Sequence, residues 1–171
     1  ERERTHFLAY HDSLTGLANR AFLLKFLEEV ISVAKREGHM VGVLFLDLDE
    51  FKGVNDRLGH RVGDRLLKAV AERLNSAVRK TDMVARIGGD EFVVVQADLE
   101  NPESVQVLGQ KLVNRIGQPY NFHGVKVNIK TSVGIAIYPQ HGNEPERLLT
   151  LADRAMYKAK KAGGNGYLFV N

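Results

Sequence analysis

Cysteine is absent from this sequence, and it contains neither a long apolar run nor a large net charge. Without cysteine the chain can form no disulfide, no thiolate metal site and no thiol-based catalytic centre. No apolar run approaches the ~20 residues that a membrane-spanning helix needs, and no signal peptide is visible. The sequence therefore favours a cytoplasmic location, in a parent protein that a separate segment could anchor to a membrane.

The charge balance is mildly basic. The chain has 24 Lys and Arg residues against 21 Asp and Glu residues, which gives a formal net charge of +3 and a pI near 9.2. This balance is compatible with a phosphate-bearing ligand. Aromatic residues are not interleaved with the basic ones, so the sequence argues against a nucleic-acid partner.

Residues 1–171 are expected to form one domain, because no low-complexity tract, internal repeat or flexible linker interrupts them. A chain of this length can bury roughly 70% of the surface that its unfolded form exposes. The opening stretch ERERTHFLAY, residues 1–10, reads as the end of a charged helix. We therefore expect it to be the end of an upstream linker helix in a longer protein.

Apolar periodicity alternates between helical and strand spacing along the chain. Helical spacing predicts helices at residues 20–37, 65–78, 102–116 and 144–163. Continuous or alternating apolar runs predict strands at residues 41–49, 83–87, 91–97, 125–138 and 167–170. Helices and hairpins in this order predict an α/β fold, a sandwich in which helices cover a mixed, largely antiparallel sheet.

Four carboxylates fall at the ends of two of these strands. Asp47 and Asp49 end the run 41–49 and share a face, because side chains alternate along a strand. Asp90 and Glu91 follow the double glycine of the expected hairpin. If the strands are neighbours, Asp47 approaches Asp90, and two close carboxylates need a cation or a proton between them. Hard oxygen ligands favour Mg²⁺ or Mn²⁺; the alternative is that these residues are helix caps and solvated turn residues.

A second polar group lies in the segment DEFKGVNDRLGHRVGD, residues 49–64. Asn55, His60 and Asp64 are separated by five and four positions, with glycines as breaks between them. One interpretation is helix punctuation, with Gly59 ending one helix and Asp64 in the first turn of the next. The other is a polar pocket, in which an aspartate accepts both N–H groups of a guanine base edge, a donor pair that adenine lacks.

Four motifs in this order resemble the GGDEF-domain diguanylate cyclases. They are HDSLTGLANR (11–20), LDLDEFKGVNDRLGHRVGD (46–64), RIGGDEF (86–92) and LADRAMYKAKKAGGN (151–165). The resemblance covers nearly the whole chain and implies a fold similar to class III nucleotidyl cyclases and polymerase palms. It also implies that two GTP molecules, one on each of two facing domains of a homodimer, condense to cyclic di-GMP and two pyrophosphates.

The resemblance implies a metal and catalytic centre at the first group of carboxylates. Asp47, Asp90 and the backbone carbonyl of Leu48 would hold two Mg²⁺ ions, or Mn²⁺ in their place. Asp90 and Glu91 would be the catalytic residues. Asp90 matches the acceptor of the 3′-hydroxyl proton, and the division of roles between it and Glu91 stays open.

The resemblance also implies a set of substrate-binding residues. Asn55 and Asp64 would read guanine, and Lys52 and Lys160 would meet the triphosphate. His60 matches a further substrate-contacting position. In the segment 49–64 the resemblance thus favours the polar pocket over simple helix punctuation.

One position departs from the family pattern. Gly164, in AKKAGGN, stands where an arginine is common, so a phosphate contact is missing. Lys158, Lys161 or Arg86 is a candidate to replace it, although lysines at a helix C-terminus need no ligand to be favourable. An arginine introduced at position 164 is expected to strengthen the contact with phosphate.

The missing arginine gives weight to a second reading. The chain would then be a catalytically weak GTP-binding module that regulates an attached EAL phosphodiesterase domain. The closing stretch MYKAKKAGGNGYLFVN resembles junctions that lead into such a domain. Sensor domains, EAL domains or both are therefore expected in the parent chain.

The stretch RKTD indicates a second ligand site. Five residues separate it from Gly88, and Arg79 and Asp82 match the RxxD site where the family binds cyclic di-GMP as an inhibitor. Charged turns with this pattern are common, but the fixed distance from the glycines favours the product site.

Overall fold

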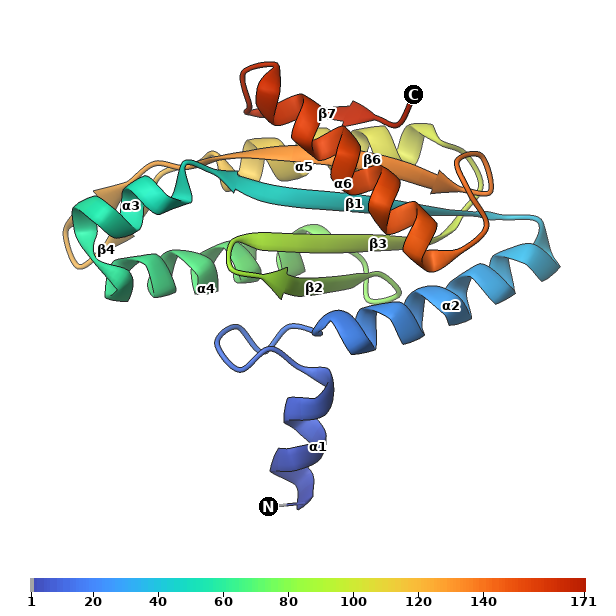
Figure 1. Cartoon of the computed structure of the whole chain (residues 1–171), viewed down its shortest axis with the longest axis horizontal. Coiled ribbons are helices and arrows are strands. Elements are labelled where there is room, and N and C mark those ends of the chain that lie inside the picture. Colours follow the sequence, from blue (N-terminus) through green and yellow to red (C-terminus); the bar gives the residue numbers. More distant parts are fainter. Residues whose placement is uncertain (1) are drawn as a thin grey trace.

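The apolar run that ends in Asp47 and Asp49 forms the centre of a five-stranded sheet in a computed structural model, which describes residues 2–171 (Figure 1). The strand order is β2-β3-β1-β6-β7. All neighbouring pairs are antiparallel except β6 and β7, which are parallel. The strands are β1 Met40–Asp49, β2 Met83–Gly88, β3 Glu91–Leu99, β6 Lys130–Tyr138 and β7 Gly166–Phe169. The predicted mixed, largely antiparallel sheet is confirmed.

Strand β1 can occupy the centre because it is apolar on both faces. Its even-numbered leucines and its odd-numbered apolar residues belong to two separate core clusters. Helices α4 (His60–Ala77) and α5 (Glu103–Ile116) cover the face of the leucines. Helices α2 (Arg20–Glu37) and α6 (Pro145–Lys161) cover the other face (Figure 1). The molecule therefore has three layers, with the sheet in the middle.

Two predicted boundaries were wrong. The helix expected to start at residue 65 is α4, which starts at His60 directly after the short helix α3 (Phe51–Leu58). Gly59, at φ 88°, ends one helix and begins the next without a loop. The strand expected at 125–138 is divided, because β5 (Val125–Val127) forms a separate hairpin with β4 (Tyr120–Phe122). Residues 123 and 124, between those two strands, both have positive φ, which suits the tight turn of a two-residue hairpin.

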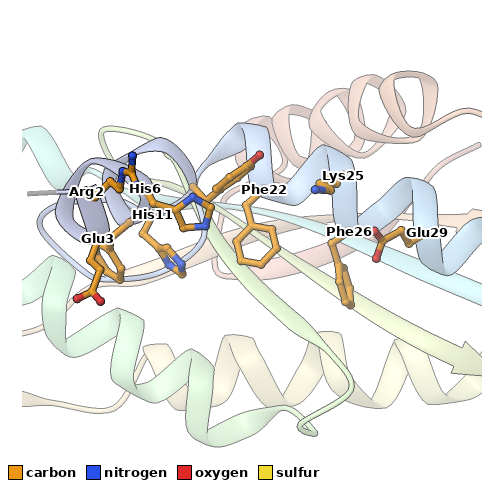
Figure 2. A pocket seen from close by; sticks show the side chains of 10 residues that line it. Arg2, Glu3, His6, His11, Phe22, Lys25, Phe26 and Glu29 are labelled. Carbon is orange, nitrogen blue, oxygen red and sulfur yellow. The ribbon is translucent and has the colours of Figure 1, made fainter.

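The first helix, α1 (Arg2–Tyr10), extends away from the sheet and has no buried residue (Figure 1). It occupies the segment predicted to end a linker helix; Glu1 lies outside the described residues. A groove of about 770 Å³ separates α1 from α2 and is lined by aromatic rings such as those of Phe22 and Phe26 (Figure 2). None of the predicted site residues lines this groove. Within residues 2–171, no helix is both long and apolar enough to span a bilayer.

Close contact between β6 and α6 depends on Gly134. A Cβ added there would lie 1.9 Å from the carbonyl oxygen of Ala152 and 2.2 Å from the amide nitrogen of Met156. We therefore expect Gly134→Ala to lower the free energy of unfolding by ~1–3 kcal/mol, because backbone atoms of α6 must move. Gly53→Ala is the matched control, since no atom lies within 4 Å of its Cβ position. Urea denaturation of both variants checks this, and equal midpoints would contradict it.

Candidate functional site

The C-terminal end of β1 brings the predicted carboxylates together. Asp47 lies directly opposite Glu91 in the ladder between β1 and β3. The amide of Leu48 donates to the carbonyl oxygen of Asp90 at 3.3 Å, which fixes the glycine turn against β1. The Asp90 carboxyl is near enough to raise the pKa of Asp47, so the two side chains approach each other, as the strand pattern predicted.

The carboxylates concentrate negative charge in a half-buried place. Burial, followed by contact with Asp90, raises the pKa of Asp47 to about 7, and the nearby Lys160 ammonium offsets part of the rise. Burial also raises the pKa of Glu91, with the charges of Asp153 and Asp90 adding to the effect. A proton or a cation between Asp47 and Asp90 relieves this repulsion.

Asp47 has an oxygen that fits a metal ligand. Its Oδ1 atom is buried and has no hydrogen-bond partner among the described residues. A buried carboxylate oxygen without a donor or a cation costs free energy. The atoms here that could bind a metal ion are carboxylate and carbonyl oxygens. A hard divalent cation such as Mg²⁺ or Mn²⁺ suits such ligands. The residues present therefore fit the predicted metal.

A tighter group of potential metal ligands lies at the other end of β1. Within residues 2–171, only Glu37, His39 and Asp98 offer three ligand atoms within 4.8 Å of one another. Nδ1 of His39 contacts Asp98 and lies 3.5 Å from Glu37 Oε2. The hydrogen bond with Asp98 raises the pKa of His39. A protonated imidazole between two carboxylates accounts for this cluster without a metal.

Asp49 holds the segment after α6 against the site. Its Oδ1 accepts a hydrogen bond from Ser132 Oγ at 2.7 Å, and its Oδ2 accepts one from the backbone N–H of Asn165 at 2.9 Å. Lys160 Nζ lies 3.5 Å from carboxylate oxygens of both Asp49 and Asp47. Strand alternation predicted that the two aspartates share a face, but no sequence signal indicated that one of them binds Asn165.

The contact with Asp49 explains the glycine at position 164. Gly164 has φ 71°, and a Cβ there would lie 2.7 Å from Asp49 Oδ2. Any other L-residue would therefore be strained and would collide with the carboxylate. The geometry thus predicts a stability cost for the arginine that was expected to strengthen a phosphate contact.

Arg86 binds the backbone of the glycine turn. Its Nε and Nη2 donate to the carbonyl oxygen of Gly89 at 3.0 and 2.7 Å, and its Nη1 donates to both oxygens of Asp12. Burial alone would raise the pKa of Asp12, but hydrogen bonds from Thr15 and Arg86 hold it below its ordinary value. Arg86 thus positions the backbone next to Asp90. The motif HDSLTG contains Asp12, but sequence reasoning gave that residue no role.

A pocket of about 980 Å³ lies beside Asp49 and is lined by basic and acidic side chains, with the basic ones in slight excess. Lys52 and Lys160, the residues predicted to meet a triphosphate, both line it. Arg57 and Lys130 also line it, and sequence reasoning missed both. They reach this pocket from α3 and from the start of β6, so only the folded chain brings them together.

The residues predicted to read guanine lie along α3 and α4. Asn55 is in α3, whereas His60 and Asp64 are exposed in the first turns of α4. The side-chain oxygen of Asn55 is buried without a hydrogen-bond partner and lies against Gly63, where a Cβ would be 1.8 Å away. This oxygen can accept an N–H group of a base. Gly59 ends α3 and begins α4, as the helix-punctuation reading predicted, but the second part of that reading was wrong, because Asp64 lies in the second turn of α4 and its first turn holds no acidic residue.

Arg79 and Asp82 form a compact turn next to β3. The guanidinium of Arg79 donates to both oxygens of Asp82 at 3.3 and 3.1 Å and to the carbonyl oxygen of Ala97 at 2.6 Å. Asp82 also accepts the backbone N–H of Ala97 at 3.1 Å. The Asp82 side chain is 1% exposed and that of Arg79 is 52% exposed. Asp82 therefore holds the arginine in place, and the arginine faces solvent.

Comparison with known proteins agrees with this geometry. A family model described as the diguanylate cyclase GGDEF domain matches residues 9–166. The chain is 49% identical over 162 residues to the bifunctional diguanylate cyclase/cyclic di-GMP phosphodiesterase MucR of Pseudomonas aeruginosa. That match covers 95% of this chain and 24% of MucR, so the chain spans about a quarter of this relative's length.

Solved structures share the whole fold. The GGDEF domain of TpbB (YfiN) from Pseudomonas aeruginosa matches with a TM-score of 0.92 at 38% identity, covering 95% of both chains. The coiled coil and GGDEF domain of DgcB from Caulobacter crescentus, solved in complex with c-di-GMP, matches with a TM-score of 0.87 at 26% identity. This second match covers 98% of this chain and 89% of that one.

The fold is thus the α/β architecture of a GGDEF domain, with a mixed five-stranded sheet between helices. The chain belongs to the GGDEF family of diguanylate cyclase domains. The resemblance drawn from the four sequence motifs is confirmed.

The contact between Gly164 and Asp49 can be tested by a double-mutant cycle. We expect Gly164→Ala to destabilise the fold by ~1–2 kcal/mol through its positive φ, with the collision against Asp49 adding to this. In an Asp49→Ala background only the first part remains, so the cost of Gly164→Ala should fall. Thermal unfolding of the four proteins measures the coupling. Identical costs in the two backgrounds would contradict the contact.

Proposed function

We propose that this domain condenses two GTP molecules to cyclic di-GMP and two pyrophosphates. The observation that carries the proposal is the buried, unpartnered oxygen of Asp47 beside Asp90 at the end of β1. Supporting it is the 49% identity to MucR, a protein named as a diguanylate cyclase and phosphodiesterase. Incubation with GTP and Mg²⁺, followed by mass detection of cyclic di-GMP, tests it directly.

Asp47, Asp90 and the backbone carbonyl of Leu48 would hold the divalent ions, Mg²⁺ or Mn²⁺. When bound, such ions lower the pKa of the 3′-hydroxyl and offset charge on the α-phosphate. Asp90 accepts the proton of the 3′-hydroxyl, with Glu91 beside it as the second catalytic carboxylate. Lys160 lies between Asp47 and Asp49 and keeps the repelling carboxylates in place.

The substrate is held at two ends. Asn55 and Asp64 accept the N–H groups of guanine, and His60 lines the same region at the start of α4. Lys52 and Lys160 contact the triphosphate from the pocket beside Asp49. We add Arg57 and Lys130 to this set, because they line that pocket and supply charge where residue 164 has no side chain.

Ring closure requires two copies of the domain. In each half-reaction the 3′-oxygen of one GTP bonds to the α-phosphorus of the other, the bond to the pyrophosphate breaks, and the hydroxyl proton passes to Asp90. Because each domain holds one GTP, two facing domains must meet, so the active state is a homodimer. No covalent intermediate with the protein is needed.

Product feedback is proposed at Arg79 and Asp82. Arginine suits cyclic di-GMP because a guanidinium donates charge-assisted hydrogen bonds to phosphate oxygens or to the O6/N7 edge of guanine. Asp82 and the Ala97 carbonyl bind Nε and Nη2 of Arg79 and hold the guanidinium in place, so Nη1 is the nitrogen that would donate to the ligand. A ligand clamped here could stop the two GTP-loaded sites from meeting.

The second candidate is a catalytically weak GTP-binding module that regulates an attached EAL phosphodiesterase domain. Two observations favour it: residue 164 lacks an arginine, and MucR is named as a bifunctional cyclase and phosphodiesterase. GTP binding without turnover would select this candidate. Under either function the parent chain would carry sensor domains, EAL domains or both, and the domain would act in the cytoplasm.

Loss of either metal-binding carboxylate should abolish turnover. We expect Asp47→Asn and Asp90→Asn each to lower the rate of cyclic di-GMP formation by at least ~10²–10⁴, because proton transfer and metal binding both suffer. Asp98→Asn is the matched control, since Asp98 lies at the other end of β3. Product formation is quantified by mass spectrometry, with circular dichroism to verify folding. Near-normal rates in either site variant would refute the assignment.

Guanine selection should depend on Asp64. We expect Asp64→Asn to reduce the preference for GTP over ATP, because an unpaired buried N–H group costs ~1–3 kcal/mol and the amide cannot accept from both guanine donors. Glu72→Gln, further along the exposed side of α4, is the control. Titration with GTP and ATP measures the ratio. An unchanged ratio would place guanine recognition elsewhere.

A further inference from the structure

Buried oxygens without a partner mark particular places in this molecule. Among residues 2–171, the buried side-chain oxygens that lack a hydrogen bond are Oδ1 of Asp47, Oδ1 of Asn55 and Oε1 of Gln96. The first two belong to the proposed metal and guanine sites. Gln96 lies towards the other end of the sheet, in β3, and sequence reasoning gave it no role.

Gln96 faces a cavity of its own. It follows Phe92 and Val94 on the core side of β3 that α4 and α5 cover, because side chains alternate along the strand. A cavity of about 400 Å³ opens there between the end of α4 and the start of α5. Gln96 and Arg79 line this cavity together with apolar Val78 and Leu108.

A glutamine at this position is costly unless something pairs with it. The residue is 9% exposed, and its strand neighbours Val94 and Val95 are completely buried apolar residues. A buried acceptor without a donor is less stable than an apolar side chain of similar size. Packing alone would therefore favour leucine or methionine over glutamine.

The cavity has the features of a base-binding pocket beside an anion contact. Val78 and Leu108 offer apolar surface to a planar ring. Oε1 of Gln96 is itself covered, and rotation about the terminal torsion of the side chain, which is a soft torsion, would turn it into the cavity as an acceptor for an N–H group.

The half-exposed guanidinium of Arg79 and the ammonium of Lys111, which also donates to the carbonyl oxygen of Ala77, supply positive charge at the edge of the cavity. The carboxylates of Asp82, which pairs with Arg79, and of Glu103 line the cavity as well. A guanine-bearing nucleotide matches this combination, since guanine presents N1–H and N2–H₂ as adjacent donors.

We propose that Gln96 reads the guanine base of cyclic di-GMP bound beside Arg79, with its Oε1 accepting a base N–H group. The identity of the ligand rests on the proposed function, whereas the pocket rests on the unpartnered amide. Arg79 binds the nucleotide on the solvent side, and Gln96 accepts a hydrogen bond from the base inside the cavity. The glutamine is thus a specificity-determining residue of the product site.

The experiment is calorimetric titration of cyclic di-GMP into the whole chain and its variants. Gln96→Leu should weaken binding at least tenfold, and Arg79→Ala should also weaken it. Gln96→Met provides a second apolar replacement if the leucine variant folds poorly. Gln110→Met is the matched control, because Gln110 is exposed on α5 and bonds only to Asn114.

Thermal unfolding separates ligand recognition from a structural role. Without ligand, Gln96→Leu should melt no lower than the wild type, because it removes an unpaired buried oxygen, and cyclic di-GMP should raise its melting temperature less. A structural glutamine would give a lower melting temperature and unchanged affinity. That result overturns the proposal.

The outcomes also separate this inference from the proposed function. Wild-type affinity in Gln96→Leu, with loss in Arg79→Ala, overturns the role of Gln96 and leaves the product site standing. Failure of the wild type to bind cyclic di-GMP overturns the pocket assignment. Cyclase activity is judged independently by GTP turnover of the wild type.

Discussion

The burial of β1 on both faces is the constraint on which the rest of the structure depends. A strand apolar on both sides must lie at the centre of a covered sheet, and its two neighbours here are β3 and β6. Its register with β3 sets Asp47 opposite Glu91. The charged end of this apolar strand therefore lies next to the turn formed by Gly88 and Gly89. The carboxylates cannot separate without breaking the central ladder, and their mutual repulsion makes the site selective for cations.

Charge balance at this edge depends on segments from across the chain. Lys160, near the end of α6, lies between Asp47 and Asp49, and Asp49 in turn holds the backbone of Asn165. The aspartate occupies the space that a side chain at residue 164 would need, which makes glycine the suitable residue. Positive charge for a phosphate must therefore come from the wall of the neighbouring pocket.

Unpartnered buried oxygens are the common feature of the proposed ligand contacts. Each of Asp47, Asn55 and Gln96 sacrifices stability in the free protein, since a buried acceptor without a donor is unfavourable. A ligand that supplies a cation or an N–H group recovers that free energy, so binding and selectivity share one physical origin. Buried polar atoms without a hydrogen-bond partner are expected at sites where a protein binds a ligand.

The sequence by itself determined the layers of the fold, because periodicity is a local property, and it determined the family through four ordered motifs. It also placed Asp47 and Asp90 at strand ends, but only the pairing of β1 with β3 in the tertiary structure brought them together. It misplaced the start of α4 and joined β5 to β6, since one glycine and one hairpin changed the path of the chain. Tertiary structure alone decided the bond from Asn165 to Asp49, the link from Arg86 to Asp12, and the cavity beside Gln96. These features depend on how elements that are far apart in the sequence pack against the sheet. The residue spacing within one segment cannot predict which distant residues will be neighbours.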